Sequence, residues 1–183
     1  DRLGIGRAVM CGLSVGGLIA PGLAARRPEG VKGLVLCDTA HRIGTTESWN
    51  ARIATVEKSG IAAIAEGILK VWFTPTFHAE RRPELDGCRA MLTRQPVEGY
   101  VATCAALREA DYTAAARAIA VPTLCVVGDQ DGSTPPALVR SMADLIPGAR
   151  LEIIENAGHI PCIEQPAALT ALLRRFLAAH AAE

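Results

Sequence analysis

The sequence predicts an α/β domain built on a mostly parallel, doubly wound sheet, and three observations support this. Four short stretches are almost continuously apolar, as expected for strands buried on both faces of a sheet. Helical patterns alternate with these stretches, which indicates parallel βαβ units. A serine lies between two glycines, directly after the first apolar stretch and directly before a helical one. The chain therefore combines a layered α/β core with a sharp turn from a strand into a helix.

The strands are expected at residues 8–11, 31–37, 123–127 and 151–154. Helices are expected at residues 16–27, 137–146 and 166–180, after the first, third and fourth strands. Pro21 lies inside the first of these helices, where a proline costs about 3 kcal/mol unless a kink is accommodated.

The stretch from 41 to 117 breaks the alternation because it has no strand pattern and much helix-forming composition. Helices are expected at residues 51–58, 61–72, 84–93 and 98–109, separated near Pro75, Pro83 and Pro96. We interpret 41–117 as a helical cap inserted between the second and third strands. Residues 1–40 and 118–183 then form the core.

Composition excludes several classes of function. Lys plus Arg equals Asp plus Glu, at 19 each, so no basic surface for nucleic acid is expected. No apolar run reaches the length of a membrane span. The six cysteines are dispersed, which predicts reduced thiols and a cytoplasmic protein. His41, His78 and His180 show no metal-ligand spacing, so no metal site is expected.

The beginning of the sequence raises a structural question. The first expected strand begins at residue 8, and neither a starting Met nor a signal peptide precedes it. We interpret the chain as lacking its beginning, which would leave one edge of the four-stranded sheet unpaired. The expectation is a chain that is unstable alone, or one that pairs with a complementary N-terminal chain or a second copy.

The clearest motif is the segment from Cys11 to Gly17, which contains G-x-S-x-G around Ser14. In this context the pattern is typical of a nucleophile elbow, whose strained turn exposes a serine hydroxyl at the carboxyl end of a sheet. Bulky residues at positions 12 and 16 would be expected to collide in such a turn. The backbone amide of Val15, at the start of the next helix, is the candidate oxyanion donor. The alternative is a glycine-rich turn with an incidental serine.

Two acids, Asp129 and Asp131, lie in the loop after the third strand. A catalytic triad needs an acid to orient a histidine that becomes cationic in the transition state. The alternative is a helix N-terminus, which Thr134-Pro135 would cap. Asp129 lies close to the strand and can cap the turn locally, whereas Asp131 lies further along the loop.

His159 lies in the loop between the fourth strand and the last helix. A single loop histidine is often only a solvated side chain. Here it follows the serine and the acids in the order Ser, Asp, His, and that order is typical of one hydrolase fold. Together the three motifs predict Ser14, Asp131 and His159 as a catalytic triad.

These motifs resemble those of the α/β-hydrolase superfamily, and the resemblance extends over nearly the whole chain. More narrowly, the sequence resembles 3-oxoadipate enol-lactonases of bacterial aromatic catabolism. The segments that carry the narrower resemblance are Cys11 to Gly17, Trp72-Phe73-Thr74-Pro75, Pro96-Val97-Glu98-Gly99-Tyr100 with Cys104-Ala105-Ala106, and Ala157 to Pro166.

The resemblance implies an α/β-hydrolase fold and hydrolysis of a small carboxylated enol-lactone to 3-oxoadipate, without cofactor or metal. It also places the triad acid at Asp131. It implies that the family's first strands, and the loop that gives a second oxyanion amide, would precede Asp1. Loss of one such donor costs roughly 100- to 1000-fold in turnover.

Several alternatives stay open at this point. Another carboxylesterase, a C–C bond hydrolase, a perhydrolase, a non-catalytic ligand-binding member or a fragment that needs a partner chain would share the fold. Trp72 is expected to line the substrate pocket or to belong to the core of the cap. Arg94 and Arg108 are the candidates for binding the substrate carboxylate.

Overall fold

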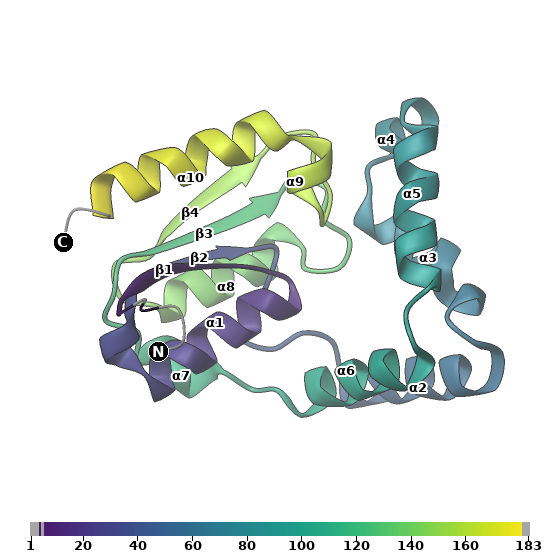
Figure 1. The fold of residues 1–183 in the computed structure, drawn as a ribbon, viewed down its shortest axis with the longest axis horizontal. Helices are drawn as coiled ribbons and strands as arrows, with labels where there is room; N and C mark the ends of the chain where they lie inside the picture. The colour runs from purple at the N-terminus through teal and green to yellow at the C-terminus, as the bar shows by residue number, and fades with distance from the viewer. Residues whose placement is uncertain (1–3, 5, 181–183) are drawn as a thin grey trace.

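Four parallel strands form the centre of the fold, in the order β1-β2-β3-β4. The computed structural model describes residue 4 and residues 6–180. The strands are β1 (Ala8–Leu13), β2 (Val31–Cys37), β3 (Thr123–Gly128) and β4 (Arg150–Ile154) (Figure 1). The predicted parallel sheet is confirmed.

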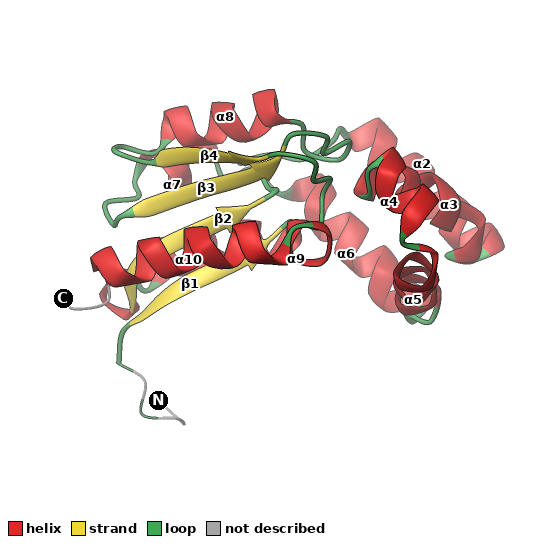
Figure 2. Cartoon of the chain, turned by 90° about the horizontal axis from the view of Figure 1, so that it is seen from above, coloured by secondary structure: helices red, strands yellow, loops and turns green. Residues whose placement is uncertain are grey.

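Helices cover both faces of this sheet, as Figures 1 and 2 show. On one face lie α1 (Val15–Arg26), α7 (Thr113–Arg117) and α8 (Pro136–Leu145), and on the other lies α10 (Pro166–His180). The continuous apolar pattern of β2 follows from this arrangement. Leu34 and Leu36 pack in the cluster with α1 and α8, whereas Val35 and Cys37 pack in the cluster with α10. Pro21 is buried inside α1, which is helical from Val15 to Arg26.

Five helices between β2 and β3 form the cap. They are α2 (Thr46–Ser59), α3 (Ala62–Trp72), α4 (Pro75–Glu80), α5 (Arg82–Thr93) and α6 (Val97–Glu109), and Figure 1 shows them beyond the carboxyl ends of the strands. The cap has apolar clusters of its own, one around Val56 and Ile68 and one around Leu69 and Phe77. It therefore packs as a helical layer over the edge where parallel strands end.

The structure adds short helices that the sequence patterns did not predict. The first turn of α4 is capped by Thr74, whose hydroxyl accepts from the Phe77 amide at 3.2 Å, with Pro75 at the first helical position. The others are a 3₁₀ turn, η1 (Pro28–Gly30), α7 and α9 (Pro161–Glu164). Although α7 lies within the range expected for the cap, Ala116 in it packs in the main core with α1 and α8.

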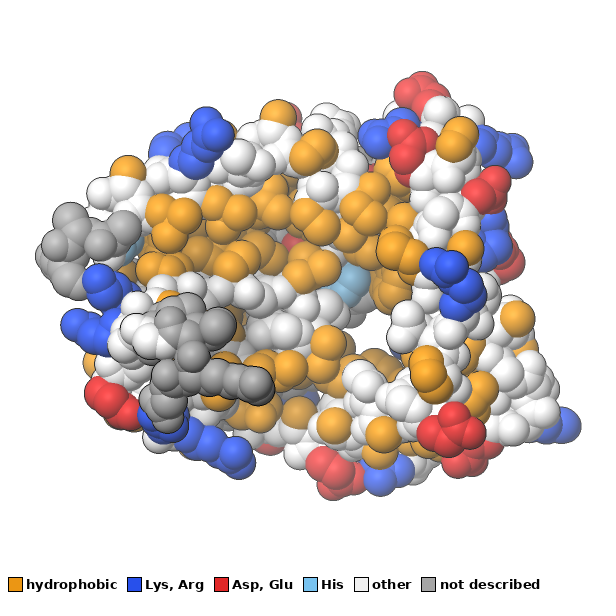
Figure 3. Space-filling model, viewed as in Figure 1, with side chains coloured by type: hydrophobic (Ala, Val, Ile, Leu, Met, Phe, Trp, Pro, Cys, Tyr) orange, Lys and Arg blue, Asp and Glu red, His pale blue; other side chains and the backbone are white. Residues whose placement is uncertain are grey.

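Among the described residues, no helix has both the length and the apolar character that crossing a membrane requires. β1 is an edge strand of the described sheet, since its only pairing there is with β2. Exposed apolar side chains lie on the helices that cover the sheet, namely Ile19 and Leu23 on α1, which packs against β1, and Leu177 on α10. Figure 3 shows hydrophobic side chains gathered between α10 and α1 on this face.

Candidate active site

Ser14 lies in a strained turn between β1 and α1. Its backbone has φ 52° and ψ −118°, a conformation that is rare for a residue other than glycine. A Cβ atom at Gly12 would lie 2.2 Å from the Gly16 carbonyl oxygen, so glycine is required at position 12, as predicted. The prediction for position 16 is wrong, because a Cβ there would meet no described atom within 4 Å apart from its chain neighbours and its own helix backbone. The second crowded position is Gly17, where a Cβ would lie 2.4 Å from Thr39.

Hydrogen bonds to the Ser14 backbone hold the turn in this conformation. The Ser14 amide donates to the Cys37 carbonyl at the end of β2, at 2.9 Å. The Ser14 carbonyl accepts from the Thr39 hydroxyl at 2.8 Å and from the Gly17 amide at 2.9 Å. These contacts anchor the serine backbone to the sheet and to α1, and thereby stabilise the strained φ.

His159 lies between Ser14 and Asp131 in a continuous hydrogen-bonded row. Its Nε2 is 2.9 Å from the Ser14 hydroxyl, and its Nδ1 is 2.9 Å from Oδ2 of Asp131. Both His159 and Asp131 are buried. An Nδ1–H that donates to the carboxylate leaves Nε2 free to accept the serine proton. The structure thus brings together the three residues that the sequence placed on separate loops.

Asp131 is held by its own loop as well as by the histidine. Its Oδ1 accepts from the amides of Ser133 and Thr134, and its Oδ2 accepts from the Thr134 hydroxyl at 2.6 Å. Burial by itself would raise the pKa of Asp131, but hydrogen bonds from His159 and Thr134 hold it below its ordinary value. Thr134 therefore binds the acid and does not cap α8, which begins at Pro136 without a side-chain cap.

Asp129 is directed elsewhere. Its side chain accepts from the Ala157 amide at 3.1 Å, and the residue is exposed. It therefore links the acid loop to the histidine loop through the backbone and forms no hydrogen bond with the imidazole in the described structure.

The end of α3 is tied to both of these loops. The Trp72 carbonyl accepts from the His159 amide at 2.8 Å, and the Val71 carbonyl accepts from the Gly132 amide at 3.1 Å. Glu164 adds a buried clamp that sequence reasoning missed, since Oε1 accepts from the Thr74 amide and Oε2 from the Gly158 amide. The position of the cap is thus coupled to the position of the triad.

A cavity of about 350 Å³ lies between the core and the cap, and Ser14, Val15 and His159 line it from the core side. Trp72 lines it from the cap, with its ring 6.2 Å from the His159 ring in a stacked arrangement. The Val15 amide is in the first turn of α1, where helix amides have no partner within the helix. A larger cavity of about 530 Å³, lined by Pro122 and Arg150, lies at the opposite ends of the strands and contains none of the triad.

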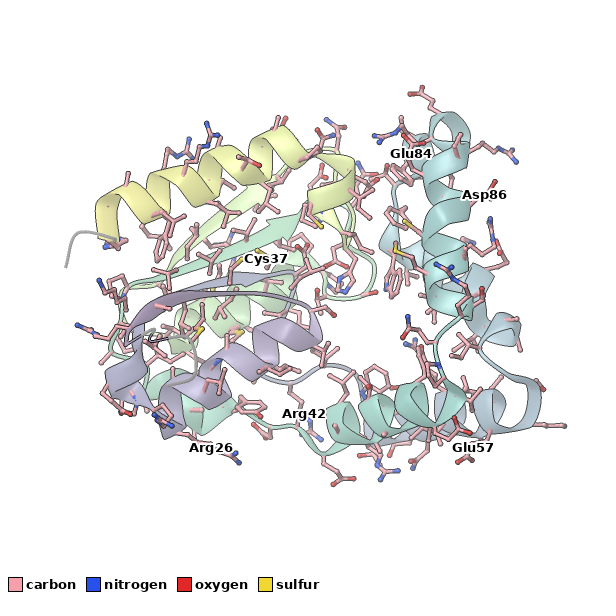
Figure 4. All side chains as sticks on the ribbon, in the orientation of Figure 1. Arg26, Cys37, Arg42, Glu57, Glu84 and Asp86 are labelled. Carbon is pink, nitrogen blue, oxygen red and sulfur yellow. The ribbon has the colours of Figure 1, made fainter. Side chains whose placement is uncertain are left out.

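The cation of this cavity is Arg52, which sequence reasoning missed. Among the described lining residues it alone is basic apart from His159, and its guanidinium lies 5.0 Å from the Trp49 ring. Neither Arg94 nor Arg108 lines the cavity; Arg108 binds Asn50 and Glu109 on the outside of the cap. Charged residues labelled in Figure 4, such as Glu57 and Glu84, also lie on the outer surface. The sequence signal that could have identified Arg52 is its spacing from Trp49. Three residues apart, the two side chains lie on one face of a helix.

One group of three side chains in the described structure has metal-ligating atoms within 4.8 Å of one another, namely Asp38, Asp131 and His159. Asp131 and His159 are hydrogen-bonded directly to each other through Oδ2 and Nδ1. A cation here would compete with that bond, so we interpret Asp131 and His159 as members of the hydrogen-bonded row and not as metal ligands.

Comparison with known proteins agrees with this geometry. The family described as the alpha/beta hydrolase fold matches residues 1–166. The chain belongs to the α/β-hydrolase family. Within it, the chain is 34% identical over 180 residues to 3-oxoadipate enol-lactonase 2 of Acinetobacter baylyi, a match that covers 96% of this chain and 67% of the relative.

Solved structures of the α/β-hydrolase family show the same likeness. The enol-lactonase from Burkholderia xenovorans LB400 aligns with a TM-score of 0.93 and 37% identity, covering 97% of this chain and 68% of that one. A thermophilic esterase from Thermogutta terrifontis, solved with malate bound, aligns with a TM-score of 0.90 and 31% identity. The alignment covers 97% of this chain and 67% of the esterase. The chain thus spans about two-thirds of the length of these relatives.

Proposed function

We propose that this protein is a serine hydrolase that cleaves a small ester or lactone through an acyl-enzyme. Ser14 is the nucleophile, His159 the general base and acid, and Asp131 the residue that orients the imidazole. The observation that carries this proposal is the continuous row from the Ser14 hydroxyl through His159 to Asp131, with both bonds at 2.9 Å and the serine on the wall of a cavity.

The geometry supports an ordinary two-step acyl transfer. Nε2 of His159 takes the Ser14 proton as Oγ attacks the carbonyl carbon, and the oxyanion that forms lies against the Val15 amide. The imidazolium then gives its proton to the leaving oxygen as the C–O bond breaks; in a lactone this oxygen stays attached to the acyl group. A water molecule gives a proton to His159 and attacks the acyl carbon, and the histidine returns that proton to Ser14.

We further propose that the substrate is a carboxylated enol-lactone, 3-oxoadipate enol-lactone, which is hydrolysed to 3-oxoadipate in the degradation of aromatic compounds. The similarity to enol-lactonases from two organisms supports this choice. Arg52 supports it independently, because a cation on the wall of an otherwise largely uncharged cavity fits a substrate that carries a carboxylate. Neither a metal nor a cofactor enters this reaction scheme.

The Arg52→Gln variant tests this substrate class. We expect the KM for the carboxylated enol-lactone to rise roughly 10- to 100-fold, since a hydrogen bond to a charged group contributes about 1.5–3 kcal/mol. Turnover of an uncharged ester such as phenyl acetate should change less than about threefold. The matched control is Arg108→Gln on the outside of the cap, which should leave both substrates unaffected. Equal losses for the charged and the uncharged substrate would contradict a carboxylate-binding role.

A carboxylesterase acting on a different small acid is the second candidate. The structural similarity to an esterase solved with malate bound favours it, because malate is also a small carboxylate. Side-by-side assays with the enol-lactone and with methyl esters of short dicarboxylic acids separate the two. The substrate with the higher kcat/KM identifies the activity.

We also propose that the β1 edge binds a complementary segment that adds strands to the sheet. The edge is unpaired in the described structure, and the helices that cover the sheet carry exposed apolar side chains, Ile19 and Leu23 on α1 and Leu177 on α10. A chain of residues 1–183 alone is therefore expected to self-associate or to unfold over a broad temperature range. Light scattering after gel filtration and thermal unfolding measure this. A monodisperse monomer with one sharp transition would contradict the proposal.

A cytoplasmic location completes the proposal. All six cysteines are free thiols in the structure, which fits a reducing compartment.

A further inference from the structure

Asp38 is a buried acid that the scheme above does not use. It follows β2 directly and has no exposed surface. Its backbone has φ 47°, and its amide donates to the Val126 carbonyl at 2.8 Å. Its Oδ1 accepts from the Gly128 amide at 2.9 Å, whereas its Oδ2 has no donor as a partner among the described residues.

The Asp38 side chain lies next to the triad acid and the triad histidine. A carboxyl oxygen of Asp38, a carboxyl oxygen of Asp131 and a ring nitrogen of His159 lie within 4.8 Å of one another. Two ionised carboxylates this close, away from water, repel each other strongly. A single proton between them removes the repulsion and turns the free oxygen of Asp38 into a donor.

The groups around Asp38 favour its neutral form. Burial is the main cause, and the nearby acids add to it, so that the pKa of Asp38 rises from 3.8 to about 9. The Gly128 amide opposes this rise. The titratable groups that face Asp38 are Asp131, His159, Glu164, Cys37 and Cys162.

We propose that Asp38 is a positioning residue for the triad: a neutral carboxylic acid whose Oδ2–H donates to Asp131 while Oδ1 accepts the Gly128 amide. The inference rests on the proposed function, since it assigns a role behind the same histidine. It gives Asp131 a donor from β2 in addition to those from its own loop. It also keeps the acid pair at one negative charge, which matches the single positive charge of the imidazolium.

Two variants separate this role from a structural one. In Asp38→Asn the amide oxygen can accept from Gly128 and the amide N–H can donate to Asp131, and asparagine tolerates a positive φ. Asp38→Gly keeps the backbone conformation without strain but removes the donor. We expect the Asn variant to keep kcat within about threefold and the Gly variant to lose about 10- to 100-fold in kcat with little change in KM.

The pH dependence of turnover distinguishes the two roles, because a purely structural role of Asp38 in packing would not change it. Wild-type turnover should change near pH 9, where Asp38 loses its proton, and the Asn variant should lack that change. Equal losses in the Asn and Gly variants would overturn the proposal. So would full activity and an unchanged profile in both.

Two further measurements involve no substrate, so they can succeed even where no ester is hydrolysed. The infrared difference between wild type and Asp38→Asn, with ¹³C-labelled aspartate, should show the carbonyl band of a protonated acid at about pH 7. Wild type should also lose stability relative to the Asn variant as the pH rises between about 4 and 9, because the folded state holds a proton that the unfolded chain releases. Absence of the acid band, or a stability difference that does not change with pH, would overturn the proposal even if the Gly variant failed to fold.

Discussion

Replacing Ser14 with alanine is expected to lower turnover of any ester or lactone substrate by about 10⁶-fold, the scale seen when a triad serine is removed. The reason is that the variant keeps His159 and Asp131 in place but has no oxygen to attack the carbonyl carbon. The fold should be retained, since the bonds that hold the turn come from the backbone of residue 14. Steady-state kinetics on an active preparation, with circular dichroism for the fold, measures the effect.

Ser133 provides a matched control for this prediction. It also lines the cavity, but it contributes only its backbone amide to Asp131, so Ser133→Ala should keep turnover within about threefold. A fluorophosphonate probe should label Ser14 in wild type and nothing in the Ser14→Ala variant. Labelling of another residue while Ser14 stays unmodified would overturn the assignment of the nucleophile.

The core of the fold was predictable because its strands are short, apolar and regularly spaced. β2 has the bounds predicted from the sequence, since Val31 to Cys37 is bounded by polar or turn residues on both sides. The meeting of the three triad loops was also predictable, because each loop follows one of these strands. Parallel strands carry the loops that follow them to one edge of the sheet, so Ser14, Asp131 and His159 meet there.

The rest of the site depended on contacts between distant parts of the chain. No sequence motif around Asp38 or Glu164 indicates that these acids are buried. Their burial arises only when β2, β3 and α9 pack together. Arg52 lies on a cap helix whose orientation over the sheet no local pattern specifies. Short helices such as α4 and α7 are below the length at which hydrophobic periodicity is informative. Whether these segments are helical depends on their caps or on tertiary contacts.

The assignment of Asp131 over Asp129 makes a prediction of similar strength. Asp131→Asn is expected to keep the fold but to lower kcat by about 10⁴-fold, the scale known for the equivalent acid of a serine protease. An asparagine at this position removes the negative charge that stabilises the imidazolium. Its amide N–H₂ also favours a histidine tautomer with the proton on Nε2, which then cannot take the proton from Ser14.

Asp129→Asn is the matched comparison, because it makes the same chemical change two residues away. Its Oδ1 can still accept from the Ala157 amide, and in the described structure the side chain forms no hydrogen bond with His159, so the loss in kcat should be below about tenfold. The ratio of the two losses therefore measures which carboxylate serves the histidine, independently of any general effect of removing a charge from this loop. If kcat fell more in Asp129→Asn than in Asp131→Asn, the hydrogen bond from His159 Nδ1 to Asp131 would not be the one that functions in catalysis.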